Sequence, residues 1–302
     1  MKVIDFHTHL FDVCGLNVHP ACGQTVKANL LEKLGYSDLL QVIIDKLIPR
    51  SFIAKSAAEI SNIASVSNLL KEMKKDNIEK SVVLPIEPSV TTEQILNECR
   101  DKPSLVPLAS IDIARLDDAE IGEEIHKKKS MFPFRGIKFH PNLQRTLPSH
   151  PKAFELYKAA QKNEMFVLLH VGKTPFLSPP ADNLAAFSNV VHALGQFPKV
   201  KFILAHMCGY FDPFKRPFDA IKQFNNVWLE TSGASSTTVY LALSKLGHKK
   251  IIFGSDWPYG TQNGSLNIVI RAIRKYVTKF PNLSIENVLQ DVLYNNGNQF
   301  IS

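Results

Sequence analysis

The chain opens with Met1-Lys2-Val3-Ile4-Asp5-Phe6-His7-Thr8-His9, a short apolar run that ends in two histidines. This run has the length and composition of a buried β-strand. Because side chains on a strand alternate between its two faces, His7 and His9 point the same way. Two imidazoles on one side of a strand end are either a pair of metal ligands or simple caps of the strand. The rest of the chain decides between these two interpretations.

Further apolar segments follow, separated by segments of helical periodicity. The predicted strands after the first cover residues 80–85, 105–109, 134–140, 165–170, 200–206, 227–230 and 250–256. Most are apolar without alternation, which is typical of parallel strands that are buried on both faces. No Gly-rich phosphate loop follows the first strand, which argues against a nucleotide-binding fold. The pattern predicts an α/β fold, a closed (β/α)8 TIM barrel.

Residues 1–302 are expected to form a single barrel domain, since α/β barrels run to about 250 residues or more. Residues 10–55 are predicted to be a helical insertion after the first strand, over the barrel mouth, with an amphipathic helix that Pro49 ends. The insertion can serve as a lid or a pocket wall. It can equally be extra surface packing or a homodimer contact, and the sequence leaves these alternatives open.

Composition and charge point to an ordinary globular protein. Hydrophobic residues make up 45% and charged residues 21% of the chain. No apolar run approaches the roughly 20 residues that span a bilayer, and the first residues lack a signal-peptide layout, so we expect a cytoplasmic protein without a membrane partner. The net charge is +7, but the lysines are spread along the chain, which favours a solvated surface over a nucleic-acid site.

The cysteines do not indicate a disulfide framework or a separate zinc site. The chain has 4 cysteines and no Cys-x-x-Cys pair. Cys14, His19 and Cys22 lie close together in sequence, but their spacing fits no common zinc motif and a fourth ligand is missing.

Polar side chains stand at the carboxyl ends of several predicted strands. In chain order they are His7, His9, Lys138, His140, His170, His206 and Asp256. Because the carboxyl ends of barrel strands share one rim, where barrel active sites lie, we expect these side chains to converge. Imidazoles combined with a carboxylate suit a divalent transition metal such as zinc, with one position left open. The sequence therefore predicts a metal centre at the barrel mouth.

Several short motifs accompany these residues. They are Asp5-Phe6-His7-Thr8-His9, Gly136-Ile137-Lys138-Phe139-His140, His170-Val171-Gly172, Ala205-His206-Met207-Cys208-Gly209, Thr231-Ser232-Gly233 and Gly254-Ser255-Asp256-Trp257-Pro258. With these motifs in this order, the chain resembles the amidohydrolase superfamily, in its amidohydrolase-related branch, over nearly its whole length. That branch includes aminocarboxymuconate semialdehyde decarboxylase-like enzymes and pyrone dicarboxylate lactonases.

The resemblance implies a metal centre with assigned roles. The implied metal ligands are His7, His9, His170 and Asp256. The implied catalytic residues are His206, together with Asp256 as the group that handles protons. One divalent ion is expected, most simply Zn²⁺, with Mn²⁺ or Fe²⁺ as alternatives. Other members hold two metals bridged by a carboxylated lysine on the fourth strand, and Lys138 lies on that strand.

The resemblance also implies the kind of reaction. We expect a metal-dependent hydrolase that uses a metal-activated water on a C–O or C–N bond of a small anionic substrate, such as a lactone or an amide. Lys138, His140 and Trp257 are the expected substrate-binding residues. The alternative is a nonoxidative decarboxylase on the same scaffold, and a non-catalytic metal-binding barrel is a third hypothesis. Some decarboxylases of the branch carry Glu in place of the first histidine, so His7 favours hydrolysis.

Overall fold

The computed structural model describes residues 1–12, 59, 63–174, 177, 180–209 and 217–302. The predicted insertion over residues 10–55 lies almost wholly outside these ranges, as do Cys14, His19 and Cys22. None of the helices within the described ranges is long and apolar enough to cross a membrane.

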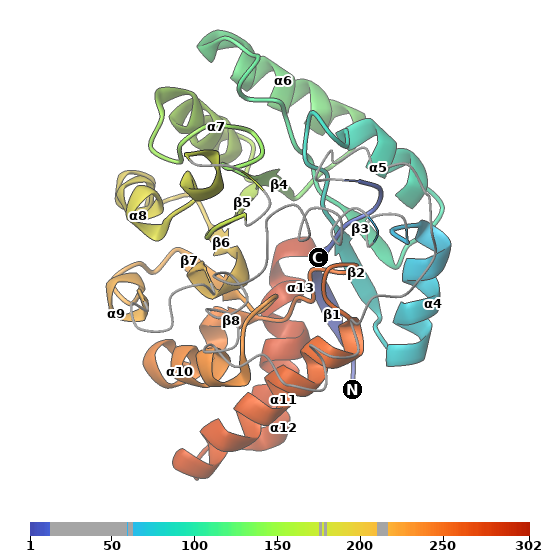
Figure 1. Cartoon of the computed structure of the whole chain (residues 1–302), viewed down its shortest axis with the longest axis vertical. Helices are drawn as coiled ribbons and strands as arrows, with labels where there is room; N and C mark the ends of the chain where they lie inside the picture. The colour runs from blue at the N-terminus through green and yellow to red at the C-terminus, as the bar shows by residue number, and fades with distance from the viewer. Residues whose placement is uncertain (13–58, 60–62, 175–176, 178–179, 210–216) are drawn as a thin grey trace.

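Short parallel strands form the centre of the molecule (Figure 1). They are β1 (Ile4–Thr8), β2 (Lys80–Val83), β3 (Leu105–Pro107), β4 (Gly136–Phe139), β5 (Phe166–Leu169), β6 (Phe202–Leu204), β7 (Val227–Glu230) and β8 (Ile251–Ile252). Hydrogen bonds join them in sequence order into a 3-stranded sheet, β1 to β3, and a 5-stranded sheet, β4 to β8. Most of these strands are shorter than the predicted segments, whereas β7 has the predicted bounds.

Backbone contacts beyond the strand ends connect the two sheets at both junctions. Between β3 and β4, the Lys138 N–H donates to the Ala109 carbonyl at 2.7 Å. Between β8 and β1, Thr8 and Trp257 form a parallel bridge, and the His9 N–H donates to the Trp257 carbonyl at 2.7 Å. The strands therefore follow one another around a ring, and the predicted α/β TIM-barrel fold class is confirmed.

Helices surround the strands (Figure 1). They are α4 (Val66–Asp76), α5 (Thr92–Cys99), α6 (Asp118–Met131), α7 (Pro151–Lys162), α8 (Phe187–Gln196), α9 (Phe218–Ile221), α10 (Ser236–Leu246), α11 (Gln262–Lys279), α12 (Ile285–Gln290) and α13 (Asn296–Ile301). Shorter turns are η1 (Ala181–Asn183), η2 (Ala205–Cys208), η3 (His248–Lys250) and the π-helical η4 (Asp291–Asn295). Several helices begin after a hydroxyl side chain that accepts a first-turn N–H: Ser65, Thr91, Ser235, Thr261 and Ser284.

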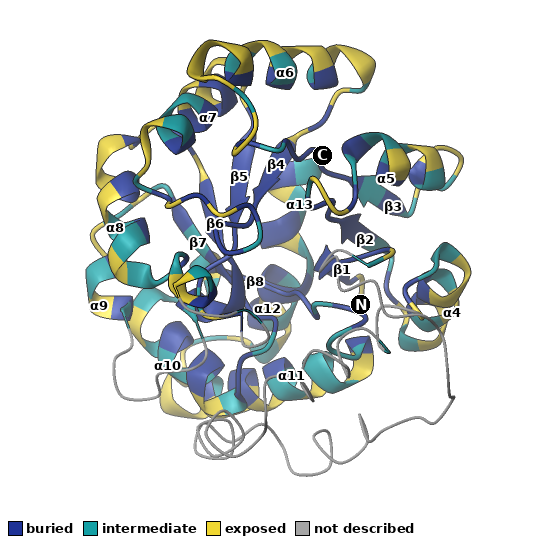
Figure 2. Cartoon of the chain, turned by 45° about the horizontal axis from the view of Figure 1, so that its top comes forward, coloured by how far each residue is buried: buried dark blue, intermediate teal, exposed yellow. Residues whose placement is uncertain are grey.

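Aromatic rings fill the amino-terminal end of the barrel. Phe300 of α13 lies 5.3 Å from the ring of Phe166 and 6.2 Å from that of Phe6, measured between centroids. All three side chains are buried, as are the strands around them (Figure 2). Because Phe166 is the first residue of β5, this packing closes the end of the barrel opposite to the strand carboxyl ends. The polar rim residues thus stand on a rigid, dry core.

A buried carboxylate holds β1 against the end of β8. Asp5 accepts hydrogen bonds from the Ser255 N–H at 2.9 Å, the Ser255 hydroxyl at 2.6 Å and the Gln262 amide at 2.8 Å. Burial raises the pKa of Asp5 to about 6, although the hydrogen bonds from Ser255 and Gln262 act in the opposite direction. Asp5 precedes His7, and Ser255 precedes Asp256, so this contact fixes the spacing between the two ends of the chain at the rim.

Candidate metal centre at the barrel mouth

Three ligand atoms from β1 and the end of β8 meet at the rim. His7 Nε2 and His9 Nε2 are 3.2 Å apart, and each lies 3.3 Å from Asp256 Oδ1. Both histidines are buried, while 20% of the Asp256 side chain is exposed. We call these three residues the rim triad.

The hydrogen-bond partners of the two Nδ1 atoms determine the tautomers of His7 and His9. His7 Nδ1 lies 2.8 Å from the Glu230 carboxylate, and His9 Nδ1 lies 3.0 Å from the Leu84 carbonyl. Each of these partners accepts, so each Nδ1 donates its proton to it. Both Nε2 atoms therefore present lone pairs to each other and to Asp256.

Such a cluster of acceptors suits a cation. Two lone pairs and a carboxylate oxygen at 3.2–3.3 Å repel one another unless a positive charge lies between them. Tetrahedral Zn²⁺ with ligands at about 2.1 Å sets its ligand atoms about 3.4 Å apart, close to the observed spacing. The rim triad could therefore hold a divalent metal ion.

The backbone at Asp256 aims its carboxylate at the histidines. Asp256 has φ of 63°, in the left-handed region that non-glycine residues rarely adopt, and its N–H donates to the His7 carbonyl at 2.8 Å. Conformations of this kind cost on the order of 1–3 kcal/mol and persist only where the surroundings enforce them. Here the tie to His7 enforces it.

A second group of ligand-type atoms lies behind His7. His7, His206 and Glu230 have ligand atoms that all lie within 4.8 Å of one another. The Ser232 hydroxyl stands among them, 2.7 Å from Glu230 Oε2 and 2.9 Å from His206 Nδ1. These atoms satisfy each other by hydrogen bonds, so this group supports the rim triad and does not itself call for an ion.

The sixth-strand histidine lies next to the fifth-strand histidine. His206 Nε2 is 3.0 Å from His170 Nδ1, whereas His170 Nε2 is buried and has no hydrogen-bond partner within the described residues. His170 belongs to neither of the two ligand groups. The structure thus places the predicted ligand His170 at the site, beside His206, and its ligation stays a prediction.

Two glycines bring His170 and His206 together. Gly172 has φ of +117° and Gly209 has φ of +91°, and a Cβ on Gly172 would lie 2.8 Å from the Gly209 Cα. Their backbones touch where the segments after β5 and β6 leave the barrel. Only glycine fits such an approach at these φ angles, which gives the two motif glycines a physical role.

The predicted substrate-binding residues lie around the same centre. Lys138 is 1% exposed, and its Nζ lies 3.5 Å from His7 Nε2. The ring of His140 stacks on that of His170 with centroids 3.8 Å apart. Trp257 is buried in the contact between β1 and β8, consistent with a packing role.

Burial controls the charges of these groups. It lowers the pKa of Lys138 to about 8, against the opposing effect of Asp256 and Glu230, and it lowers the pKa of His206 to about 4. Burial also acts to raise the pKa of Asp256, but nearby positive charge, that of Lys138 included, outweighs burial and holds this pKa below the ordinary value. At neutral pH His7, His140, His170 and His206 are therefore neutral, Asp256 is ionised and Lys138 carries an ammonium.

Comparison with known proteins identifies the family. The model of the amidohydrolase family matches residues 4–285, which is most of the chain. The chain belongs to the amidohydrolase family. The predicted family is confirmed, and the protein is an enzyme of the amidohydrolase superfamily. No curated protein matches the chain significantly.

Solved structures of the same fold are distant in sequence. The 5-carboxyvanillate decarboxylase from Sphingomonas paucimobilis is 13% identical, with a TM-score of 0.66 over 99% of this chain and 98% of that one. A dihydroxybenzoic acid decarboxylase from Polaromonas with bound manganese is 14% identical, with a TM-score of 0.66 over 99% and 96%. A probable 2-pyrone-4,6-dicarboxylic acid hydrolase from Acinetobacter baumannii is 17% identical, with a TM-score of 0.56 over 100% and 99%.

Two residues of this amidohydrolase site were not among the predicted site residues. Glu230 is fully buried and contacts His7 and Ser232, and Ser232 contacts His206. Glu230 is the last residue of β7, so the rule that selected the other strand-end residues also indicates it. Burial raises the pKa of Glu230 to about 8, and its hydrogen bonds with Ser232 act against that shift.

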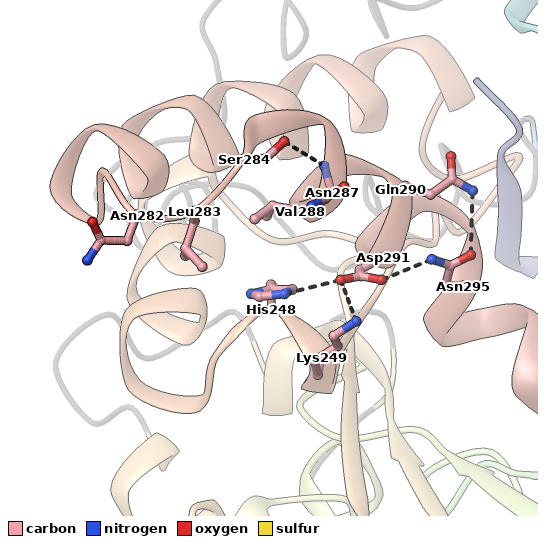
Figure 3. Close-up of a pocket in the computed structure, with 10 residues that line it drawn as sticks. All are labelled: His248, Lys249, Asn282, Leu283, Ser284, Asn287, Val288, Gln290, Asp291 and Asn295. Atoms are coloured by element: carbon pink, nitrogen blue, oxygen red, sulfur yellow. Dashed lines mark hydrogen bonds and ion pairs between the residues drawn. The ribbon is translucent and has the colours of Figure 1, made fainter.

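A separate pocket lies at the other end of the amidohydrolase barrel (Figure 3). Its volume is about 430 Å³, and its carboxylate, Asp291, contacts His248 at 3.1 Å, Lys249 at 2.7 Å and Asn295 at 2.9 Å. His248 and Lys249 precede β8, whereas Asp256 follows it. Residues at this amino-terminal end of barrels contribute to stability, and Asp291 already has its partners.

The glycine contact generates a testable expectation. We expect Gly172→Ala to push the segments after β5 and β6 apart, because its Cβ meets the Gly209 backbone at 2.8 Å and its φ is +117°. The variant should lose about 1–3 kcal/mol of unfolding free energy in urea titrations. It should also bind Mn²⁺ more weakly.

Gly122→Ala is the matched control, since a Cβ there meets nothing within 4 Å and the residue lies inside α6. It should leave metal binding unchanged and stabilise the helix by up to about 1 kcal/mol. Equal stability of Gly172→Ala and the wild type would mean that the close approach of the two glycines is not needed.

Proposed function

We propose that this amidohydrolase binds one divalent metal at the rim triad, holds the carboxylate of a small substrate at Lys138, and transfers a proton through Asp256 and His206. The observation that carries the proposal is the convergence of His7 Nε2, His9 Nε2 and Asp256 Oδ1 at 3.2–3.3 Å.

His7, His9 and Asp256 would hold the metal, and His170 is the proposed further ligand because its buried Nε2 has no partner among the described residues. Imidazole and carboxylate ligands accept both Zn²⁺ and Mn²⁺. When bound, the metal would supply a Lewis acid that polarises a substrate oxygen or activates a water. The neutral state of the buried imidazoles is the state that binds a metal.

Lys138 supports an anionic substrate. Its ammonium is buried, and within the described residues no carboxylate lies in salt-bridge contact with it. A buried charge without an ionic partner is costly, so a substrate carboxylate that pairs with it gains a strong interaction. Binding should weaken as pH rises through about 8, where Lys138 loses its proton.

Asp256 and His206 are both in their basic forms at neutral pH. Each can therefore accept a proton before it returns one. Asp256 is part of the rim triad and its side chain is partly exposed, so it can reach a water or a substrate. His206 lies deeper and is held by Ser232 on one side and His170 on the other.

Hydrolysis of a C–O or C–N bond uses these groups directly. Asp256 takes a proton from the attacking water and gives it to the leaving group, while His206 orients the reacting oxygen. A site in its basic form and a histidine at position 7 both favour this reaction.

Nonoxidative decarboxylation is the second candidate, and the comparisons favour it. The similar structures include decarboxylases of carboxylated phenols. In this reaction Asp256 or His206 first takes a proton from water and delivers it to the carbon as the C–C bond to the carboxylate breaks. The carbon dioxide that leaves combines with the remaining hydroxide to give bicarbonate. The shared fold does not decide between the reactions.

Two substitutions distinguish the residues that bind the metal from those that act in catalysis. We expect His7→Ala to reduce bound metal severely, because it removes one vertex of the rim triad, and His206→Asn to retain metal while turnover falls by about 10²-fold or more. Metal content by mass spectrometry and turnover are measured on the same preparations. Full metal retention in His7→Ala, or near-normal turnover in His206→Asn, would contradict the assigned roles.

The product separates the two reactions. Hydroxylated benzoates and pyrone or lactone carboxylates are incubated with the Mn²⁺- and Zn²⁺-loaded enzyme, and released bicarbonate is measured. Hydrolysis should give ring-opened acid without bicarbonate, whereas decarboxylation should give equal amounts of bicarbonate and decarboxylated product. His206→Asn is the control for background reaction. Failure to turn over either substrate class would contradict the proposed substrate.

A further inference from the structure

Glu230 contacts His7 directly and contacts His206 through the Ser232 hydroxyl. Its Oε2 lies 2.8 Å from His7 Nδ1 and 2.7 Å from the Ser232 hydroxyl, and its Oε1 accepts the Ser232 N–H. The side chain is fully buried, and each of these contacts brings a donor to it. The hydrogen bonds from Ser232 act against the burial that raises the pKa of Glu230 to about 8, and in its ionised form Glu230 acts only as an acceptor.

The first branch from Glu230 is direct. His7 Nδ1 donates to Glu230, so His7 Nε2 carries a lone pair and faces His9 Nε2 and Asp256 Oδ1. Without an acceptor at Nδ1, the proton could move to Nε2 and point at the rim triad.

The second branch runs through three further side chains. The Ser232 hydroxyl has one proton, which it donates to Glu230. It therefore accepts from His206 Nδ1 at 2.9 Å, which leaves a lone pair on His206 Nε2. His170 Nδ1 then donates to that nitrogen at 3.0 Å, and His170 Nε2 carries a lone pair.

The opposite direction of this branch is unfavourable. It would place an N–H at His170 Nε2, which is buried and has no partner among the described residues. A buried donor without an acceptor costs about 1–3 kcal/mol. The direction that starts at Glu230 avoids this cost.

We propose that Glu230 and Ser232 are positioning residues whose hydrogen bonds set the tautomers of His7, His206 and His170 together, so that one carboxylate orients metal-binding nitrogens on both sides of the site. The inference rests on the proposed metal-dependent function. It adds the residues that prepare the ligands, and it links His206 to the metal ligands by a chain of named atoms.

The surrounding residues are built around this carboxylate. A Cβ at Gly254 would overlap the Glu230 carboxylate, so only glycine leaves room for it there. The neighbouring Thr231 hydroxyl bonds instead to the Gly254 backbone, at 3.1 Å from its N and 3.2 Å from its O. Thr231 is therefore a buried hydroxyl beside the chain of hydrogen bonds but outside it.

The test measures binding of Mn²⁺ alone, followed by the electron paramagnetic resonance signal of the free ion. We expect Ser232→Ala, which breaks the second branch, to weaken binding about 10-fold. We expect Glu230→Gln, which replaces one acceptor oxygen by an amide donor, to weaken it by about 10- to 100-fold. Thr231→Val, which removes a hydroxyl of similar burial, should stay within about twofold of the wild type, and circular dichroism checks that each variant is folded.

The double variant shows whether the two residues act in one chain. Because Ser232 acts through Glu230, adding Ser232→Ala to Glu230→Gln should cost less than it does in the wild type. Fully additive losses would overturn the inference, as would Ser232→Ala binding Mn²⁺ like Thr231→Val. A wild type that binds no Mn²⁺ would overturn the proposed function together with the inference, so the two failures are distinguishable.

Histidine ¹⁵N spectra of the metal-free protein give a readout that does not depend on metal affinity. The wild type should show Nδ1–H tautomers for His206 and His170, and Ser232→Ala should convert at least one of them to Nε2–H. An Nε2–H tautomer of either ring in the wild type would contradict the proposed direction.

Discussion

Mutual repulsion among three acceptor atoms is the constraint around which the rest of the site is built. His7 Nε2, His9 Nε2 and Asp256 Oδ1 stand 3.2–3.3 Å apart, and nothing in their own chemistry holds them there. The contact of Asp5 with Ser255 and Gln262 joins β1 to the end of β8, and the left-handed backbone at Asp256 directs the carboxylate inward. The fold thus opposes the repulsion, and a bound cation would relieve it.

The barrel fold and most of the rim residues could be predicted from the sequence, because they depend on the order of the strands and on the residues at strand ends. Continuous apolar strands indicate a parallel sheet, and a parallel barrel brings the residues after its strands to one rim whatever their separation in sequence. His7, His9, Lys138, His170, His206 and Asp256 were selected by that rule, and the structure gathers them. The family motifs were informative for the same reason, since each covers a strand end. No such rule predicts the structure of the insertion over residues 10–55, and most of it lies outside the described residues.

Other features of the site depend on tertiary contacts that the spacing of residues in the sequence does not reveal. His206, Met207 and Cys208 have φ of 57°, 49° and 67°, a run of left-handed residues that no local propensity favours and that tertiary packing must hold. The contact between Gly172 and Gly209 joins two motifs that are far apart in the chain. Glu230 could have been chosen as a strand-end residue, but its importance comes from facing two histidines at once, which requires the closed barrel. The reaction is even harder to predict from the sequence, because hydrolysis and decarboxylation use the same metal ligands and proton carriers.

The central claim is that the rim triad holds a metal ion, and anomalous scattering from crystals grown with Mn²⁺ tests it most directly. The account expects a single strong anomalous peak in contact with His7 Nε2, His9 Nε2 and Asp256 Oδ1. A peak among Glu230, Ser232 and His206 in its place, or no peak at the barrel mouth at saturating Mn²⁺, would contradict it.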